Sequence, residues 1–364
     1  MRFLTFTISI IITTLLCHAE GVATWLSTSH NFGTFKEELG KVSCEMKMIN
    51  TGDSDIKITK VRATCGCTAT SYTLEPITPG DTASVIVTYN PNGRPGRFDK
   101  DVYVYTSGTP DKCTLTIKGN VIGSHATIQQ KYPISVGALK LDQRIIPFGE
   151  ISKGRSRTQF ISLYNQSDDT LKAVFSNVPQ YLHIGMVPEI VLPGELSTIT
   201  ITYHSEKNDD WGFSQDVFTM ETLPASGYSN NTVAGIGNIE VTARLVEKFN
   251  NLSQKERAEA PIAKLSCHKI DFNRIKTNEN PIKKSFTITN IGKSKLYIRK
   301  IYSNDKNIEI KCNKYEIKPN KTAKVEISVY PQKLDKLLNS TMEVITNDPN
   351  NPQQTVRLVG QIIK

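Results

Sequence analysis

One skeleton of landmark residues occurs three times along this chain at almost constant spacing. Each copy begins with a phenylalanine followed by glycine or asparagine: Phe32-Gly33, Phe148-Gly149 and Phe272-Asn273. An asparagine turn follows 18, 17 and 18 residues after the Phe, at Asn50, Asn165 and Asn290. A second turn comes a further 29, 28 and 29 residues along, at Pro79-Gly80, Pro193-Gly194 and Pro319-Asn320. Spacings that agree within one residue over three copies predict three tandem copies of one small domain.

The runs between these landmarks alternate apolar and polar residues, as half-buried β-strands do. In the run 42–48, one face carries Val42, Cys44, Met46 and Met48, and the runs 84–89 and 100–105 repeat the pattern. The sequence shows no long helical periodicity in any copy. Short strands between Pro, Gly, Asn and Asp turns, over about 100 residues a copy, predict an all-β fold of three immunoglobulin-like (Ig-like) β-sandwiches.

These patterns place domain 1 at residues 20–123, domain 2 at 132–247 and domain 3 at 262–364. The link between the first two domains is short, so we expect them to be rigidly related. The second copy carries a long insertion, 222–238, ahead of its last strand at 239–246. The charged segment 247–260 precedes the third copy, and its composition favours a flexible linker over a helical turn.

The N-terminus has the pattern of a secretory signal peptide over residues 1–19. Arg2 supplies the positive start, residues 3–16 are almost wholly apolar or Ser/Thr, and Ala19 ends a small-residue cleavage site. Lipid attachment at Cys17 is the alternative, although the bulky Leu16 disfavours it. No later segment approaches the ~20 apolar residues of a membrane-spanning helix. We therefore expect export, to the periplasm or the cell surface, of a chain without a transmembrane segment.

Cysteine usage agrees with export. Six cysteines remain once the signal peptide is removed, and each domain that has any holds an even number. Domain 1 contains Cys44, Cys65, Cys67 and Cys113, domain 3 contains Cys267 and Cys312, and domain 2 contains none. Four cysteines allow three pairings, and the sequence does not choose between them. Cys267 and Cys312 are the simplest candidates for one structural disulfide.

The first copy resembles a bacterial family of exported Ig-like domains that has no assigned function and carries a Cys-Gly-Cys-Thr signature. It is similar more broadly to ASH/Hydin-like and major-sperm-protein-like sandwiches. The matching residues are Asn50-Thr51-Gly52-Asp53, Cys65-Gly66-Cys67-Thr68, Pro79-Gly80-Asp81 and Tyr89-Asn90. The third copy shares the turns but has Ser303 to Asn307 in place of the cysteine pair, and the second copy is the most divergent. The resemblance implies fold and export and brings no reaction.

Cys65-Gly66-Cys67 is the most distinctive chemical feature of the sequence. Two thiols one residue apart can bind a soft metal such as copper or zinc, can join each other in a redox-active disulfide, or can each pair with another cysteine. Structural disulfides to Cys44 and Cys113, which we expect near the same rim, are the first expectation. Metal binding has weak support because a closed zinc site needs four ligands. No arrangement of His, Ser, Asp or Glu predicts a catalytic site or a cofactor.

The positive charge of the chain is concentrated in domain 3. Residues 263–364 contain 20 Lys and Arg against 9 Asp and Glu, a net charge of +11, whereas the whole chain has +9. Nucleic acid is an improbable partner for an exported chain, so the excess favours an anionic glycan or lipid surface. Six cations fall on or near adjoining predicted strands: Lys283, Lys284, Lys293, Lys295, Arg299 and Lys300. The alternative is a solvated, lysine-rich sheet surface.

Together these observations predict an exported, non-enzymatic binding or scaffolding protein of the bacterial cell envelope, with no cofactor. Its partner would be another envelope protein, bound at an exposed strand edge, or an anionic surface. The alternative is a periplasmic thiol-redox or copper-handling protein that acts through Cys65 and Cys67.

Overall fold

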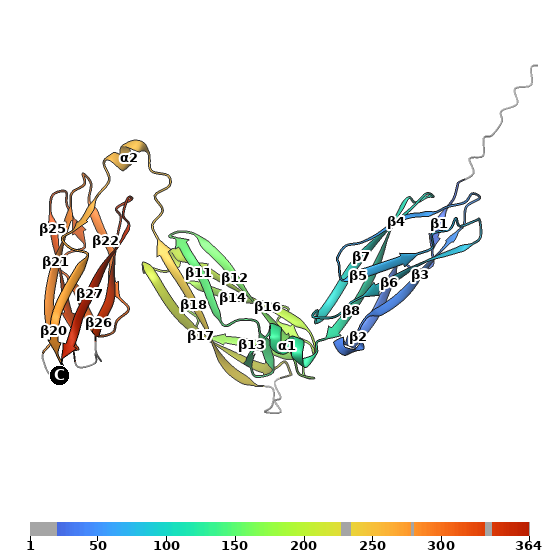
Figure 1. Ribbon diagram of the computed structural model, residues 1–364, viewed down its shortest axis with the longest axis horizontal. Helices are drawn as coiled ribbons and strands as arrows, with labels where there is room; N and C mark the ends of the chain where they lie inside the picture. The colour runs from blue at the N-terminus through green and yellow to red at the C-terminus, as the bar shows by residue number, and fades with distance from the viewer. Residues whose placement is uncertain (1–19, 227–233, 278–279, 332–336, 364) are drawn as a thin grey trace, which may run out of the picture.

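The computed structural model describes residues 20–226, 234–277, 280–331 and 337–363, and it consists almost entirely of β-strands (Figure 1). Six sheets pair into three sandwiches that follow one another along the chain. The predicted all-β fold of three Ig-like domains is therefore confirmed. The predicted signal peptide, residues 1–19, lies outside the described residues. No helix among the described residues is long and apolar enough to cross a membrane.

Domain 1 packs two four-stranded sheets. The first has the order β1 (Ala23–Trp25), β3 (Val42–Asn50), β6 (Thr82–Tyr89), β5 (Thr68–Tyr72). The second has the order β2 (Ser29–Lys36), β8 (Lys112–Ile122), β7 (Gly96–Thr106), β4 (Ile58–Ala63). A short 3-10 turn, η1 (Glu37–Leu39), follows β2.

Domain 2 packs two five-stranded sheets. The first has the order β14 (Leu182–Val187), β16 (Leu196–His204), β12 (Ser156–Asn165), β10 (Leu139–Leu141), β9 (Ile134–Val136). The second has the order β11 (Ile145–Ser152), β18 (Gly235–Val246), β17 (Gly212–Pro224), β13 (Leu171–Ser176), β15 (Ile190–Val191). A 3-10 turn, η2 (Ser205–Lys207), follows β16.

Domain 3 packs a four-stranded sheet on a five-stranded one. The first has the order β19 (Ala263–Leu265), β21 (Ile282–Asn290), β25 (Thr322–Val329), β23 (Ile308–Cys312). The second has the order β20 (Lys269–Lys276), β27 (Gln353–Ile363), β26 (Leu337–Thr346), β22 (Leu296–Ser303), β24 (Glu316–Ile317). Each sandwich encloses its own apolar core.

The constant spacing of the repeat has a direct physical cause, because the two turns bond to each other. Asn50, Asn165 and Asn290 are fully buried. The backbone carbonyl of each accepts a hydrogen bond from the second turn, at 2.8 Å from Gly80, 3.0 Å from Gly194 and 2.9 Å from Asn320. These three turn residues have positive φ, which glycine and asparagine adopt most readily. A shift in spacing would break this bond in the core.

The aromatic landmark lies at a bulge in a parallel strand pair. β2 pairs with β8, β11 with β18 and β20 with β27, and each register shifts next to the Phe. The residue after the Phe has positive φ in every copy, at Gly33, Gly149 and Asn273. The bulge turns the aromatic ring inward, so that Phe148 and Phe272 are buried and Phe32 packs against the core of domain 1.

Three connections differ from expectation. A short helix, α1 (His125–Lys131), joins domains 1 and 2, and the Ser124 hydroxyl caps it. The segment 247–260, expected as a linker, contains a second helix, α2 (Gln254–Ala258), because Ser253 and Glu256 form a reciprocal capping box. The expected insertion 222–238 is shorter, since β17 runs to Pro224 and β18 begins at Gly235, and residues 227–233 lie outside the described residues.

Candidate functional site

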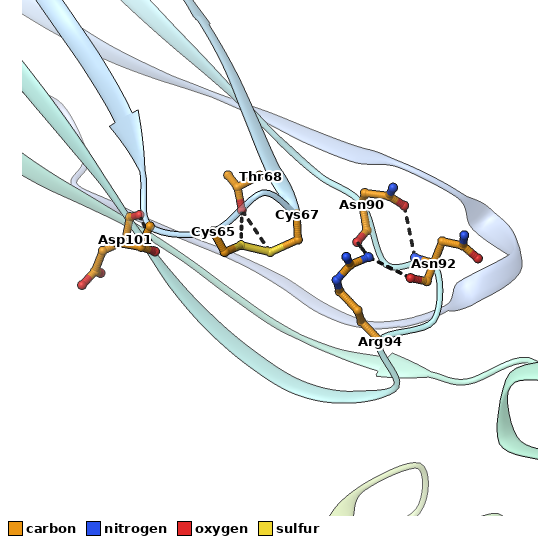
Figure 2. The surroundings of a disulfide bond; sticks show 8 residues. Cys65, Cys67, Thr68, Asn90, Asn92, Arg94 and Asp101 are labelled. Atoms are coloured by element: carbon orange, nitrogen blue, oxygen red, sulfur yellow. Dashed lines mark hydrogen bonds between the residues drawn. A yellow bond between two sulfur atoms is a disulfide. The ribbon is translucent and has the colours of Figure 1, made fainter. Parts of the chain in front are cut away.

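The Cys65-Gly66-Cys67 turn joins β4 to β5, which are the edge strands of two opposite sheets. A disulfide links Cys65 to Cys67, with 5.3 Å between their Cα atoms (Figure 2). This separation lies in the usual range for a disulfide. The sequence left three alternatives open for these cysteines, and the structure shows the one in which Cys65 and Cys67 pair with each other. The expected structural disulfides to Cys44 and Cys113 are not formed.

The other cysteines of domain 1 have free thiols. Cys44 lies on β3 opposite Val87, and Cys113 lies on β8 opposite Val104, so the two belong to opposite sheets. Burial raises the pKa of the Cys44 thiol to about 11 and also raises the pKa of the Cys113 thiol. Neither thiol is activated at neutral pH.

The disulfide expected between Cys267 and Cys312 is likewise not formed, and both thiols are free. Cys267 follows β19, whereas Cys312 ends β23 at the other edge of the same sheet. Two strands, β21 and β25, lie between them. Because neighbouring strands are about 4.8 Å apart, the distance between the two cysteines exceeds the limit of about 7 Å for bridged Cα atoms. The sequence could not show this, because the pairing depends on strand order.

The two sulfur atoms of the turn differ in their surroundings. Cys67 is 8 % exposed and belongs to the core of domain 1, whereas Cys65 is half-buried and Gly66 at the tip is exposed. A Cβ atom added at Gly66 would meet nothing within 4 Å, so the tip faces open space. The buried hydroxyl of Thr68 lies 3.6 Å from Cys65 Sγ and 3.7 Å from Cys67 Sγ. Among the residues that the structure describes, Thr68 is the side chain whose hydroxyl lies within hydrogen-bonding distance of both sulfurs.

The same turn occurs in the other two domains without cysteine. In domain 1 the Thr68 N–H donates to the Cys65 carbonyl at 3.3 Å, and the Asn90 N–H donates to the Cys67 carbonyl at 2.9 Å. Domain 2 has the corresponding bonds from Leu182 to Pro179 and from His204 to Tyr181, and domain 3 has them from Ile308 to Asp305 and from Tyr330 to Asn307. The backbone therefore closes this turn with two hydrogen bonds in each copy.

A metal site at this turn would first require reduction of the disulfide between Cys65 and Cys67. Soft metals bind thiolates, and the joined sulfurs of a disulfide offer none until the bond is reduced. Within residues 20–226, 234–277, 280–331 and 337–363, no group of three or more His, Cys, Asp or Glu side chains could hold a metal ion. The copper-handling alternative therefore finds no additional ligands beside Cys65 and Cys67 in the described part of the chain.

The six cations predicted to form one surface do not gather on one face. Lys283 and Lys284 lie on β21, Arg299 and Lys300 lie on β22, and these strands belong to opposite sheets. Lys293 is exposed in the turn between them. The prediction was wrong because the chain crosses between the two sheets after Asn290, which strand periodicity does not reveal.

Most of these cations also have acidic partners. Lys283 Nζ lies 3.0 Å from Glu326 and Lys295 Nζ lies 2.8 Å from Glu316. Lys284 donates to the carbonyl of Asp271 and lies over the Phe272 ring. Arg299 and Lys300 bind acidic residues of domain 2, as described next, so both belong to a contact between domains.

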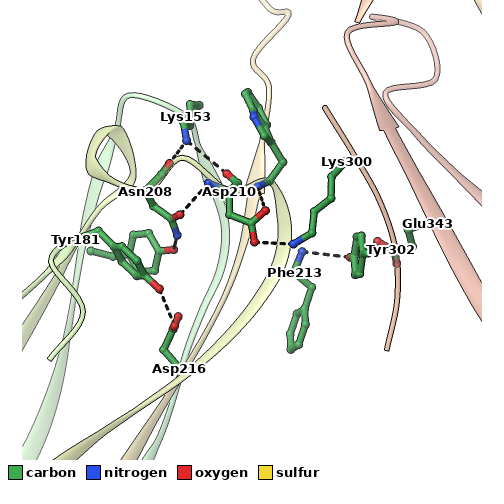
Figure 3. Close-up of polar contacts among 11 residues, drawn as sticks. Lys153, Tyr181, Asn208, Asp210, Phe213, Asp216, Lys300, Tyr302 and Glu343 are labelled. Carbon is green, nitrogen blue, oxygen red and sulfur yellow. Dashed lines mark hydrogen bonds and ion pairs between the residues drawn. The ribbon is translucent and has the colours of Figure 1, made fainter. Parts of the chain in front are cut away.

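The contact between domains 2 and 3, here called the second joint, is made of charged and aromatic side chains. Lys300 Nζ lies 2.5 Å from Asp210 (Figure 3). Arg299 binds both oxygens of Glu247, at 2.8 Å and 3.0 Å. Trp211 has the Arg299 guanidinium 5.1 Å and the Lys153 ammonium 5.2 Å from its ring centre. Arg299 and Lys300, which the sequence suggested would bind an anionic surface, therefore bind domain 2 at the second joint.

A half-buried carboxylate, Glu343, joins the two domains at the second joint. Glu343 of β26 accepts hydrogen bonds from Arg244 of β18, at 3.0 Å, and from the Tyr302 hydroxyl. The Tyr302 hydroxyl in turn accepts the backbone N–H of Phe213 at 3.2 Å (Figure 3). Burial, followed by the hydrogen bond to Glu343, raises the pKa of Tyr302 to about 12, so the phenol remains a donor. No sequence signal marked Glu343, Tyr302 or Arg244.

Comparison with known proteins finds a similar family for each of the two outer domains. A family described as a protein of unknown function (DUF1573) matches residues 23–121, and the HYDIN/CFA65/VesB-like Ig-like domain family matches residues 261–361. The first match agrees with the resemblance of the first copy to a family of unknown function, and the second shows a Hydin-like relation for the third copy. That the first family is bacterial and exported stays a prediction. The likeness to major-sperm-protein-like sandwiches stays a prediction. No curated protein matches the sequence.

Several solved structures are similar to this chain. A protein of unknown function from Porphyromonas gingivalis W83 has 16% identity and a TM-score of 0.47, covering 62% of this chain and 100% of that one. An ASH/PapD-like domain of human CEP192 has 11% identity and a TM-score of 0.26, covering 32% and 93%. The secreted serine protease VesC from Vibrio cholerae has 12% identity and a TM-score of 0.26, covering 51% and 47%. At these identities the likeness concerns the fold alone. The first domain is therefore similar to the DUF1573 domains over residues 23–121, and the third to the HYDIN/CFA65/VesB-like Ig-like domains over residues 261–361.

Proposed function

We propose that the chain is an exported, non-enzymatic binding or scaffolding protein of the bacterial cell envelope. The proposal rests on the two contacts between neighbouring domains, which hold three complete sandwiches in a row (Figure 1). A scaffold needs fixed distances between its binding surfaces, and joints with buried polar contacts and packed side chains supply them.

The contact between domains 1 and 2, here called the first joint, supports the proposal. Ile128 of helix α1 and Tyr132, which follows the helix as its C-cap, pack with Tyr164 of domain 2 in a small apolar cluster of their own. The Tyr164 hydroxyl accepts the Gly123 N–H at 3.2 Å. Arg97 of domain 1 binds Glu195 of domain 2 at 2.5 Å, and Glu195 is itself largely buried. These contacts fix domain 2 on the end of domain 1.

An anionic glycan or lipid surface is the proposed partner of domain 3. The outer face of the sheet β19–β21–β25–β23 places exposed Lys264, Lys283 and Lys324 on neighbouring strands, with Lys321 in the turn before β25. Among the residues that the structure describes, Lys264, Lys321 and Lys324 take part in no ion pair, unlike Lys283. Unpaired cations on one face attract anionic surfaces at low desolvation cost.

Sedimentation with lipid vesicles tests this proposal. The protein lacking residues 1–19 should bind vesicles that contain phosphatidylglycerol and should remain in solution with pure phosphatidylcholine. The triple variant Lys264→Gln, Lys321→Gln, Lys324→Gln should lose this binding. The matched triple Lys36→Gln, Lys57→Gln, Lys60→Gln removes three exposed lysines of domain 1 and should retain it. Equal binding by both triple variants would refute the assigned face.

A second candidate function is favoured by one specific observation, the disulfide between Cys65 and Cys67. In this function the pair exchanges electrons with thiols in the envelope. A redox titration of the native protein, read by alkylation of Cys65 and Cys67, separates it from a purely structural role.

A further inference from the structure

We infer that Cys65–Cys67 is a thiol–disulfide exchange site in which an incoming thiolate attacks Cys65 Sγ and Cys67 leaves as the thiolate. The partner is a dithiol, either a protein with two cysteines or a small molecule. This inference rests on the second candidate function and adds to it the attacked sulfur, the leaving sulfur and the residue that assists the leaving group.

The fold does not depend on this disulfide to form the turn. The turns of domains 2 and 3 connect the same pairs of strands and are closed by the same two backbone hydrogen bonds, with Pro179-Gln180-Tyr181 and Asp305-Lys306-Asn307 in place of the cysteines. The disulfide spans a sequence separation of 2, so it constrains little of the unfolded chain. Its opening therefore leaves the sandwich in place, as reversible chemistry at this position requires.

The location of the turn leaves Cys65 more exposed to an incoming thiol than Cys67. β4 and β5 are the edge strands of the two sheets, so the turn lies on the open side of the sandwich, and Gly66 at its tip is exposed. Cys65 is half-buried at this edge, whereas Cys67 is 8 % exposed and packs into the core. Access decides which sulfur is attacked, so the mixed disulfide forms on Cys65.

The Thr68 hydroxyl is placed to assist the leaving group. It lies 3.7 Å from Cys67 Sγ and is buried, so water competes little for it. A hydrogen bond to the thiolate lowers the pKa of that thiol, and a leaving thiol of lower pKa departs faster. Thr68 is a positioning residue here, because it acts through Cys67.

The exchange takes place in two successive thiolate attacks. The partner thiolate forms a bond to Cys65 Sγ, the bond between Cys65 and Cys67 breaks, and Cys67 takes the electron pair as a thiolate. The second thiol of the partner, as its thiolate, then attacks the partner sulfur of the mixed disulfide and releases Cys65. The partner dithiol has lost two electrons and two protons and is now a disulfide, while Cys65 and Cys67 have gained both as a dithiol.

The first experiment tests the exchange itself on the full protein lacking residues 1–19. The native protein is equilibrated in dithiothreitol buffers, alkylated, and mapped by peptide mass. We expect Cys65 and Cys67 to be reduced together, with Cys65 alkylated in the native protein and Cys67 alkylated once the quenched protein is denatured, while circular dichroism and the thermal midpoint change little. If both stay oxidised in excess dithiothreitol until the protein unfolds, the second candidate function fails, and the inference fails with it.

The second experiment tests the assigned roles. Cys67→Ser leaves only Cys65 in the turn and Cys65→Ser leaves only Cys67, and each variant is treated with oxidised glutathione. Because accessibility limits attack, we expect the mixed disulfide on Cys65 to form at least about tenfold faster than the one on Cys67. Equal rates, or a faster reaction at Cys67, would overturn the assignment while leaving exchange itself intact.

Thr68→Val provides a nearly isosteric test of the hydroxyl. In the Cys65→Ser background it should raise the pKa of the Cys67 thiol, followed by thiolate absorbance, and in the wild-type background it should slow reduction by dithiothreitol. Thr68→Ser keeps the hydroxyl and should restore both values. A Thr68→Val protein with an unchanged thiol pKa and reduction rate would remove Thr68 from the proposal.

Discussion

Glu37 and Ser124 bind each other across the start of the first joint, with the Glu37 carboxylate accepting the Ser124 backbone N–H at 2.8 Å. The same carboxylate accepts the Gly93 N–H at 2.6 Å and the Thr127 hydroxyl at 2.8 Å. Ser124 is also the cap of helix α1, whose Thr127 N–H it accepts. One buried side chain of η1 therefore ties together the end of domain 1, a neighbouring loop and the helix that leads to domain 2.

Glu37→Ala should loosen the first joint. The substitution leaves three donors without an acceptor in a buried position, at a cost of about 1–3 kcal/mol for each group that water does not reach. Hydrogen exchange followed by mass spectrometry should show faster exchange in α1 and in residues 90–95, with unchanged exchange in the core of domain 3. The exposed neighbour Glu38→Ala is the matched control, and equal protection in both variants would contradict the role of Glu37.

The first joint should also weaken in acid. Burial alone would raise the pKa of Glu37, but hydrogen bonds from Gly93, Ser124 and Thr127 outweigh it and hold the pKa below the ordinary value of 4.5. A carboxylate with a lowered pKa stabilises the folded joint above pH 4.5, and this contribution is lost as the pH falls through the lowered pKa. The protection of α1 against exchange, corrected for intrinsic rates, should fall over this acidic range in wild type. Glu37→Gln should lack that step.

Glu343→Ala should loosen the second joint. It removes the acceptor shared by Arg244 and Tyr302, which leaves a half-buried guanidinium and a phenol unpaired at a cost of about 1–3 kcal/mol. Small-angle X-ray scattering should report a wider range of interdomain arrangements, and Trp211 fluorescence should shift. Glu326→Ala breaks the exposed pair with Lys283 in the same domain and should change neither measurement. A Glu343→Ala protein with wild-type scattering would contradict the prediction.

Asn290→Ala should destabilise domain 3 alone. The Asn290 amide donates to the carbonyls of Ser294 and Ile317, at 2.8 Å and 2.9 Å, and its oxygen accepts the Gly292 N–H at 3.0 Å. Loss of these buried partners should reduce the stability of the domain by about 2–4 kcal/mol. Hydrogen exchange resolves the three domains separately, and peptides of domains 1 and 2 should be unaffected. The exposed Asn351→Ala is the control, and a similar loss there would show that the burial of Asn290 is not the cause.

The Cys44 thiol should be inert in the folded protein. Burial raises its pKa to about 11, so almost none of it is thiolate at neutral pH. Iodoacetamide at neutral pH should modify Cys44 only when domain 1 unfolds, whereas Cys65 should react in the folded protein once the disulfide is reduced. Peptide mapping along a urea titration measures both, and early modification of Cys44 would show that the core opens locally.

The architecture could be predicted from sequence because its landmarks are local and physically linked. Asn50 and Gly80 keep their spacing since they bond to each other in the core, and the same holds for Asn165 with Gly194 and for Asn290 with Asn320. Alternation along each strand then indicated which residues face inward. The spacing of the landmarks and the alternation along each strand can both be read from the sequence without knowledge of strand order.

The pairing of side chains across the molecule could not be predicted in the same way. Lys284 and Arg299 are close in sequence but lie on opposite sheets, and Cys267 and Cys312 lie at opposite edges of one sheet. Alternation gives the face of a residue and says nothing of which sheet receives its strand. Glu37, buried with three donors around it, looks like any charged residue of a loop until the joint is assembled.

The parallel strand pairs β2–β8, β11–β18 and β20–β27 have a mechanical consequence. In each domain, the chain enters near the start of one strand and leaves from the end of its parallel partner. Tension applied along the chain pulls these two strands past each other, so all the hydrogen bonds between them bear the load at once and do not part in succession. We therefore expect each sandwich to resist stretching along the chain.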